Sequence, residues 1–261
     1  MSAQGVNGKP YRVDRGYVEV AGSDAEDYLE RMLSNEVAAL EVGSAAKALL
    51  LTPKGRIIAS LRVVRTAPET FLLITDATDL AVPVANTLIA SRFAARCAIE
   101  VRPWAGFVQH GTEPEAPAIR VDDFGVEAWE AWRENLGEGA DPQELEELRI
   151  EAGTPAWGAE LDDSILPAEA GLDETHISFT KGCFPGQEPI ARLHHRGHVN
   201  RRLRRLEVES ARAGDDIVWN DKVVGRVTSA VPGRALGYVR TEVPDDGVLS
   251  VRGGQARMRP A

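Results

Sequence analysis

Residues 181–188 have the sequence KGCFPGQE. This octapeptide gives the strongest indication of the fold and function of the chain. Its two glycines and its proline surround one thiol, that of Cys183. Glycine permits positive φ angles and proline restricts the residue before it, so the segment is predicted to form an exposed turn. Lys181 and the cationic residues that follow would favour the thiolate of Cys183. The octapeptide therefore predicts that Cys183 is a reactive thiol supported by Lys181. The alternative is that Cys183 packs under the turn as a small apolar side chain.

The octapeptide opens a cationic segment in an acidic chain. The 261 residues contain 30 Lys and Arg against 40 Asp and Glu, a formal net charge of -10. Residues 181–205 contain seven of the basic residues and one acidic residue, so this segment carries +6 and the rest of the chain -16. Four of the five histidines lie in or just before it, namely His176, His194, His195 and His198. A chemical site is therefore predicted in this segment.

The residue types in this segment are also compatible with other kinds of site. Cys183 with His194 or His195 could form the nucleophile and base of a thiol hydrolase. The same histidines with Cys183 are metal-ligand types, but they lack a recognised spacing, so no metal-binding residue is predicted. The run 201–205, RRLRR, is either a solvated strand edge or an anion site for a carboxylate or a phosphate. The net charge of -10 argues against tight non-specific RNA binding.

Length, cysteine count and hydropathy limit the class of protein. A length of 261 residues favours roughly two domains. Cys97 and Cys183 lie 86 positions apart, which excludes a disulfide framework and a self-contained zinc or iron–sulfur site in one chain. No apolar run reaches the roughly 18 residues that a membrane span needs, and the first residues have no apolar signal region. We therefore expect no membrane contact and a cytoplasmic location.

The N-terminal stretch is predicted to alternate helices and strands. Ser23 and Glu26 form a capping box ahead of a helix of about ten residues. Residues 49–51 and 57–64 flank a TPKG turn and indicate a β-hairpin. The remaining elements expected here are a strand over 71–74, a helix from Thr78 to about Arg92, and a short strand over 99–101.

The middle of the chain is predicted to hold two acidic helices. The first covers 126–136 and places Trp129 and Trp132 on one face for core packing. The second starts at Asp141 as N-cap, followed by Pro142 and the capping-box residue Glu144, and stops at Gly153. From Val199 onward, short β segments separated by turns predict a small β-barrel of about 60 residues, with Asn220–Asp221 as a hairpin tip.

The octapeptide resembles the K-G-C-[FY]-x-G-Q-E signature of the YgfZ/GcvT-related folate-binding family, which comprises iron–sulfur cluster assembly relatives of the glycine cleavage T protein. All the specified positions of the signature are matched. Four more segments resemble the family's motifs in order: SNEV at 34–37, LTPKGR at 51–56, RIEAGTP at 149–155 and ILPAEAGL at 165–172. The resemblance covers about residues 19 to 205.

The resemblance implies an α+β fold: a three-lobed GcvT-like ring with ferredoxin-like α/β subdomains and a small C-terminal β-barrel. We expect domains over 1–104, 105–198 and 199–261, the first two interleaved. Tetrahydrofolate or a derivative would bind in a central channel. Glu151 matches the glutamate that bonds the pterin ring, and a carboxylate suits that role because it accepts two N–H hydrogen bonds. The other expected cofactor contacts are Gln187, Glu188, Arg192 and Arg196.

One departure from the T protein concerns its catalytic chemistry. Where the T protein has acidic residues, including a catalytic aspartate, this chain has Ala59 and Ser60. Neither side chain can act as a carboxylate base. The sequence therefore favours a folate-binding accessory protein for iron–sulfur cluster assembly or repair over a classical aminomethyltransferase. Cys183 would be the reactive thiol of this protein and would bind an iron–sulfur species transiently.

Partners and alternatives follow from this interpretation. One cysteine cannot hold a four-thiolate cluster, so a cluster would be shared with iron–sulfur assembly proteins or client enzymes. The first alternative is a folate-dependent aminomethyltransferase or demethylase. The second is a tRNA-modification factor that contacts RNA through the run 201–205.

Overall fold

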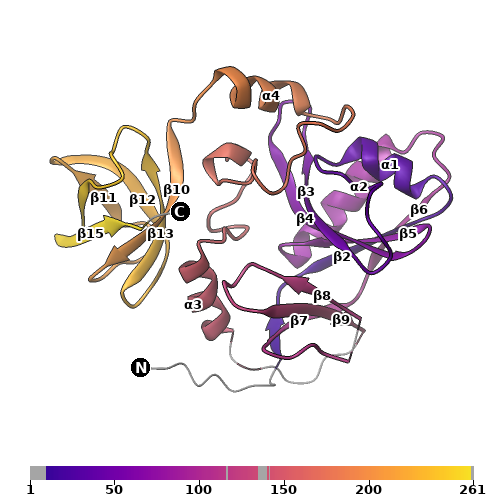
Figure 1. The fold of residues 1–261 in the computed structure, drawn as a ribbon, viewed down its shortest axis with the longest axis horizontal. Coiled ribbons are helices and arrows are strands. Elements are labelled where there is room, and N and C mark those ends of the chain that lie inside the picture. The colour runs from indigo at the N-terminus through magenta and orange to yellow at the C-terminus, as the bar shows by residue number, and fades with distance from the viewer. Residues whose placement is uncertain (1–9, 116, 135–139, 141, 260–261) are drawn as a thin grey trace.

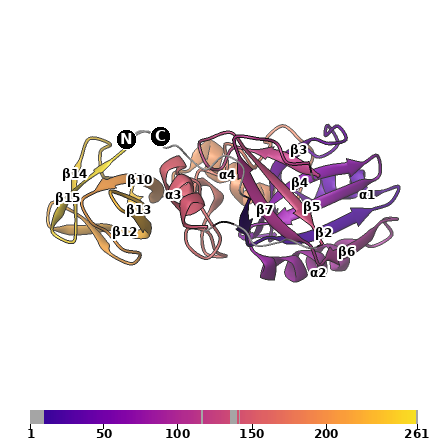
Figure 2. The ribbon, with the colours of Figure 1, turned by 90° about the horizontal axis from the view of Figure 1, so that it is seen from below.

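The structure is a computed structural model that describes residues 10–115, 117–134, 140 and 142–259. Its elements form an α/β lobe at one end, a smaller sheet with its helix in the middle and a β-barrel at the other end (Figure 1). The view from below shows the same order, with α3 and α4 between the barrel and the large sheet (Figure 2). This is the expected α+β, three-lobed architecture.

A five-stranded antiparallel sheet of order β3-β4-β5-β2-β6 forms the α/β lobe. Its strands are β2 (Gly16–Ala21), β3 (Ala45–Leu51), β4 (Ile57–Ala67), β5 (Thr70–Thr75) and β6 (Ala98–Arg102). On one face, Phe71 and Leu73 pack with residues of α1 (Ala25–Met32) and α2 (Ala81–Ser91), and η1 (Thr78–Leu80) precedes α2. On the other face, Leu72 and Ile74 pack against the second sheet. Because both faces are covered, these strands are almost continuously apolar.

A four-stranded antiparallel sheet of order β1-β7-β9-β8 packs against the first. Its strands are β1 (Tyr11–Val13), β7 (Ala105–His110), β8 (Ala118–Val121) and β9 (Ala128–Arg133). Leu145 of α3 (Gln143–Ala152) joins the same core as Val108 and Trp132. The second sheet is therefore fixed between the large sheet and α3.

The barrel closes on itself in the order β10-β13-β12-β11-β14-β15. Its strands are β10 (Arg201–Val208), β11 (Asp216–Trp219), β12 (Lys222–Val231), β13 (Arg234–Arg240), β14 (Val248–Val251) and β15 (Gly254–Met258). The segment before it carries η2 (Pro167–Glu169) and α4 (Gln187–Arg196). In one apolar cluster, Ile165 and Ile190 of that segment pack with Leu51 of the sheet and Tyr238 of the barrel. This cluster joins the large sheet to the barrel.

Most of the predicted elements are confirmed. The hairpin of β3 and β4, the strands β5 and β6, the helices α1, α2 and α3, and the closed barrel all form where the sequence indicates. Asn220 and Asp221 have φ angles of 49° and 60° and form the tip of the β11–β12 hairpin. Gly153 ends α3 with a φ of 82°. No helix in the described part of the chain is long and apolar enough to cross a membrane.

Two details of the helix starts differ from the prediction. The residue at the N-cap of α1 is Asp24, and no side chain caps the helix, so the Ser23–Glu26 capping box does not form. The Ser23 hydroxyl donates instead to Asp24 Oδ1 at 3.2 Å. Asp141, the expected N-cap of α3, lies outside the described residues, and the helix has Pro142 at its N-cap. The domain boundaries stay predictions.

The predicted helix over 126–136 is wrong, because residues 128–133 form β9. Residues 135 and 136 lie outside the described part. In a strand, side chains three positions apart point to opposite faces, so Trp129 and Trp132 do not share a face. Trp132 is buried and Trp129 is half-buried. The apolar–polar alternation typical of a strand was not visible in the sequence, because the acidic residue Glu130 is on the same buried face as Trp132. Glu130 is buried there as the partner of two arginines.

Candidate functional site

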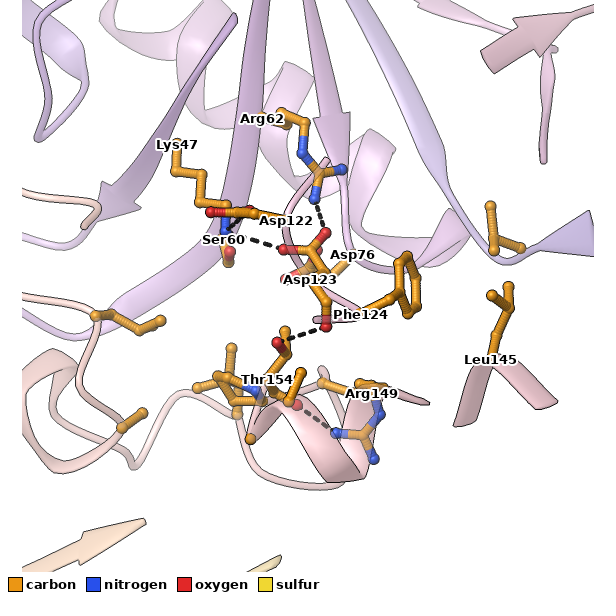
Figure 3. A pocket seen from close by; sticks show the side chains of 18 of the residues that line it. Lys47, Ser60, Arg62, Asp76, Asp122, Asp123, Phe124, Leu145, Arg149 and Thr154 are labelled. Atoms are coloured by element: carbon orange, nitrogen blue, oxygen red, sulfur yellow. Dashed lines mark hydrogen bonds and ion pairs between the residues drawn. The ribbon is translucent and has the colours of Figure 1, made fainter. Parts of the chain in front are cut away.

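The lobes enclose a central pocket with a volume of about 450 Å³ (Figure 3). This size lies within the usual range for small-molecule sites, roughly 300–1,000 Å³. Side chains from segments far apart in sequence line it. These include Lys47 of β3, Ser60 and Arg62 of β4, Asp76 after β5, Asp122 to Phe124 between β8 and β9, Arg149 of α3, and Thr154, Thr175 and His176 from the segment that follows α3.

Paired charges form one wall of the central pocket. Arg62 lies between Asp123 and Glu130, with 2.5 Å between its Nη1 and Glu130 Oε2. Lys47 Nζ lies 2.9 Å from Asp123 Oδ1 and 2.5 Å from Asp122 Oδ1. Burial alone would raise the pKa of Asp123, but Arg62 and Lys47 outweigh it and lower that pKa. These pairs therefore keep their charges and tie β3 and β4 to the loop between β8 and β9.

His176 is a neutral base beside that charged wall. Its side chain is 7% exposed, and burial together with Lys47 and Arg62 lowers its pKa to about 3. The Thr175 hydroxyl lies 2.8 Å from its Nδ1. Its backbone carbonyl accepts a hydrogen bond of 2.6 Å from the Ser34 hydroxyl, which fixes the segment to the large sheet.

Asp76 is the pocket's half-buried carboxyl group. Burial raises its pKa, whereas Arg15 and Arg62 act in the opposite direction. Ser60 also acts against the rise in the pKa of Asp76. Ser60 lies in β4, Asp76 directly follows the neighbouring strand β5, and both side chains line the pocket.

Cys183, the predicted reactive thiol, is exposed in the loop that precedes α4. No hydrogen bond joins it to a histidine within the described residues, so the thiol-hydrolase pairing has no support in the geometry. His194 instead stacks on Phe179, with 3.9 Å between the ring centroids. No group of three or more His, Cys, Asp or Glu residues in the described part of the chain could hold a metal ion.

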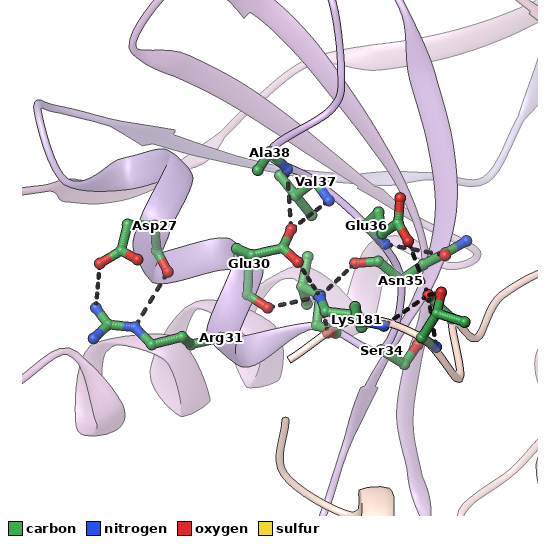
Figure 4. Close-up of polar contacts among 12 residues, drawn as sticks. Asp27, Glu30, Arg31, Ser34, Asn35, Glu36, Val37, Ala38 and Lys181 are labelled. Atoms are coloured by element: carbon green, nitrogen blue, oxygen red, sulfur yellow. Dashed lines mark hydrogen bonds and ion pairs between the residues drawn. The ribbon is translucent and has the colours of Figure 1, made fainter. Parts of the chain in front are cut away.

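The ammonium of Lys181 binds backbone carbonyl groups at the end of α1 and just after it (Figure 4). It donates hydrogen bonds to the carbonyl oxygens of Glu30, Leu33 and Asn35 at 2.6, 2.9 and 2.7 Å. Its side chain is only 2% exposed, and Glu30 Oε1 lies 3.1 Å from Nζ. An ammonium has three N–H donors. The carbonyls use all three, so Lys181 anchors the loop and has no donor left for the Cys183 sulfur.

The other predicted cofactor contacts also lie away from the central pocket. Gln187, Glu188, Arg192 and Arg196 belong to α4, and none of them lines the pocket. Glu188 and Arg192 form a largely exposed ion pair at 3.8 Å. In the arginine run, Arg201 pairs with Glu169 at 3.0 Å and Arg204 with Asp245 at 2.8 Å. These arginines already have carboxylate partners, which weakens the case for an anion site there.

Glu151, the predicted pterin contact, lies at the junction of α3 with the barrel. Its carboxylate pairs with Arg234 of β13 and, at 2.5 Å, with Arg259 Nη1. It does not line the central pocket. Two arginines occupy the carboxylate oxygens that a pterin would need, so the structure assigns Glu151 to docking of the barrel.

Three comparisons with known proteins find similarity to the glycine cleavage T protein and its relatives. The GCVT N-terminal domain matches residues 14–87. An uncharacterized protein of Haemophilus influenzae is 28% identical over 230 residues, which cover 82% of this chain and 81% of that protein. The aminomethyltransferase of a Nostoc species is 36% identical over 143 residues, 51% of this chain and 37% of the enzyme. A crystal structure of the glycine cleavage system aminomethyltransferase T from Bartonella henselae has the same fold, with a TM-score of 0.85, 19% identity and coverage of 97% of this chain and 86% of that one.

This chain is similar to the glycine cleavage T protein in its N-terminal region and in its fold. The matched GCVT region contains β4 and β5, and with them Ser60 and Asp76 of the central pocket. Ala59 is buried in the core, whereas the Ser60 side chain lines the central pocket. The predicted loss of a carboxylate therefore falls at the pocket itself.

Several charged residues of the central pocket were not predictable from sequence motifs. Lys47, Arg62 and Asp76 belong to no motif. One usable signal existed: Lys47 and Arg62 are charges that interrupt mainly apolar stretches of β3 and β4. Such a charge must be paired when it is buried, so it indicates an acidic partner elsewhere in the chain.

Proposed function

We propose that this chain binds tetrahydrofolate or a derivative in the central pocket and acts as an accessory protein for iron–sulfur cluster assembly or repair. The observation that carries the proposal is the pocket of about 450 Å³ in a fold shared with an aminomethyltransferase. Its walls offer a carboxyl group without an ion partner in Asp76 and an exposed cation in Arg12. That combination suits a ligand with N–H donors on its ring and carboxylates on its tail.

Cys183 is the second part of the proposal. Its exposure and the anchoring of its loop by Lys181 present one thiol to solvent in a fixed place. A single thiolate can share a cluster or an oxidised intermediate with a partner but cannot hold a four-thiolate cluster alone. Cys97 is buried, and burial raises its pKa, so it is unsuited to this role.

Folate binding is tested by calorimetric titration of the purified chain with tetrahydrofolate without oxygen. Thr175→Trp places a bulky side chain at an exposed position of the pocket wall and should weaken binding at least about tenfold, because it fills ligand space. Glu151→Ala is the control and should bind as the wild type does. Absence of saturable binding by the wild type, or loss of binding in Glu151→Ala alone, would refute the pocket as the folate site.

The thiol is tested in a strain whose iron–sulfur enzymes depend on this protein. Cys183→Ser should lower the activity of those enzymes without changing tetrahydrofolate affinity, because Cys183 does not line the pocket. Cys97→Ala is the matched control and should support normal activity. In the purified wild type, a thiol reagent should modify one cysteine rapidly and the other only after unfolding. Full activity with Cys183→Ser would rule out the role given to this residue.

An aminomethyltransferase or demethylase is the second candidate function. The observation in its favour is that Asp76 supplies a carboxyl group to the pocket although Ser60 replaces the expected acid. The assay is formation of 5,10-methylene-tetrahydrofolate from tetrahydrofolate and a methylamine donor. Turnover would favour this candidate, and binding without turnover would favour the accessory protein.

A further inference from the structure

The pairing of β4 with β5 places Asp76 beside Ser60. In the antiparallel register Leu61 faces Thr75, so the next positions along the two strands are Ser60 and Asp76. Both side chains line the central pocket, and Ser60 acts on the Asp76 carboxyl group by lowering its pKa. β4 has no carboxyl group at Ser60, but Asp76, at the paired position directly after β5, provides one beside it.

Asp76 differs from the other carboxylates of the pocket in its bonding. Asp122 and Asp123 pair with Lys47, and Glu146 pairs with Arg149. The remaining one, Asp14, accepts hydrogen bonds from Thr78. Among the described residues, no cation lies within 4 Å of the Asp76 carboxyl group, so it forms no ion pair. Its oxygens are therefore available to a ligand in a way that the paired carboxylates are not.

Several groups act on Asp76 from the elements around it. Arg15 comes from the turn between β1 and β2, Arg62 from β4 and Asp123 from the loop between β8 and β9. Burial and Asp123 favour the neutral acid, whereas the two arginines and Ser60 favour the carboxylate. Burial prevails and raises the pKa of Asp76. A half-buried carboxylate without an ion partner gains from an added N–H donor, because hydrogen bonds to charged groups are stronger than neutral ones.

We propose that Asp76 is the acceptor for an N–H group of the ligand in the central pocket and takes over from β5 the position that Ser60 leaves vacant on β4. The ligand's identity as a reduced pteridine rests on the proposed function, whereas the assignment of Asp76 rests on the strand register and on its free carboxylate. Only the ionised carboxylate accepts the bond with both oxygens; the protonated acid also presents a donor to the ligand's N–H group.

The test is tetrahydrofolate affinity measured by calorimetry between pH 5 and pH 8. For the wild type, affinity should fall as pH decreases through the raised pKa of Asp76, because protonation removes the acceptor. Asp76→Asn should bind about 10- to 100-fold more weakly at pH 8 and should lose this pH dependence. Asp79→Asn is the control, since Asp79 is exposed on η1 and does not line the pocket.

A double variant distinguishes a ligand contact from a structural role. Ser60→Asp combined with Asp76→Asn returns a carboxylate to β4 and should restore affinity and its pH dependence at least in part. Thermal unfolding of each variant checks that the fold persists. If Asp76→Asn binds like the wild type with the same pH profile, the role of Asp76 is overturned while the proposed function stands. If the wild type does not bind tetrahydrofolate, the proposed function falls, and the assignment of Asp76 as a folate contact falls with it.

Discussion

At the scale of single residues, His176 couples the stability of the protein to pH. Its pKa is about 3 in the folded chain, against 6.5 for an unperturbed histidine. Between these values the unfolded chain binds the proton and the folded chain does not, so stability decreases as pH falls below 6.5. From pH 7 to pH 5, this histidine should cost about 2 kcal/mol of folding free energy.

His176→Asn should therefore show a smaller loss of stability between pH 7 and pH 5 than the wild type, by about 2 kcal/mol. Urea unfolding at the two pH values measures it. His198→Asn is the control, because His198 is exposed, and it should keep the pH dependence of the wild type. Equal pH dependence in His176→Asn and the wild type would contradict the neutral, buried state of this ring.

Residues identified in the sequence differ in how far the structure supports their roles. Cys183 is exposed as predicted, because two glycines and a proline dictate the turn locally. Lys181 and Glu151 are engaged elsewhere, one by backbone carbonyls and one by barrel arginines. A charged side chain bonds to whatever the fold brings near it, and its sequence neighbours do not reveal those partners.

At the scale of elements, Gly186 fixes the loop of Cys183 against the β3–β4 hairpin. Its φ is +83°, and an added Cβ would lie 2.5 Å from the Thr52 carbonyl oxygen and 3.1 Å from Gly55 Cα. Gly186→Ala should destabilise the protein by about 2–4 kcal/mol, because it combines a strained φ with a clash against backbone. Urea unfolding measures the loss.

Gly182→Ala is a matched control in the same loop. An added Cβ there would meet no atom within 4 Å, and its φ is not in the left-handed range, so the change should stay within about 0.5 kcal/mol. Equal stability of the two variants would show that the loop is not held by its contact with the hairpin.

Strands and turns that depend on local signals were predictable, and β9 was not. The hairpin tip at Asn220–Asp221 needs two positive φ angles, which these residue types tolerate. In β9, Glu130 is fully buried because Arg15 and Arg62 neutralise it. When the partners of a buried acidic residue in a strand are unknown, the residue is taken as solvent-exposed. The sequence pattern then fits the exposed face of an amphipathic helix.

At the scale of the whole molecule, Glu160 joins α3 to the barrel. It is 1% exposed, and its Oε2 lies 2.9 Å from Arg149 Nη1, while Ser229 of β12 donates a bond of 2.6 Å to its Oε1. Glu160→Ala should cost about 3–5 kcal/mol, because it leaves a buried arginine without one of its carboxylates. Urea unfolding measures the loss, and limited proteolysis should show the barrel released first.

The control for Glu160 is an exposed pair of the barrel. Glu242 lies 3.6 Å from Arg240, and both side chains are more than half exposed. Glu242→Ala should change stability by no more than about 0.5 kcal/mol. A Glu160→Ala variant as stable as Glu242→Ala would show that the barrel docks through other contacts.

The sequence by itself determined the α+β architecture, the closed barrel and the exposed thiol loop. The architecture was implied by the resemblance of contiguous motifs to a known family, whereas the barrel strands and the thiol loop follow from apolar periodicity and turn residues, which act between near neighbours in the chain. Only the tertiary structure decided the central pocket and the free state of Asp76. Lys47, Arg62 and Asp123 become one buried wall because packing of the two sheets removes them from water, and charges removed from water must pair. In the described part of the chain Asp76 forms no ion pair, since Arg15 and Arg62, the two cations that act on it, pair with Glu130 and Asp123.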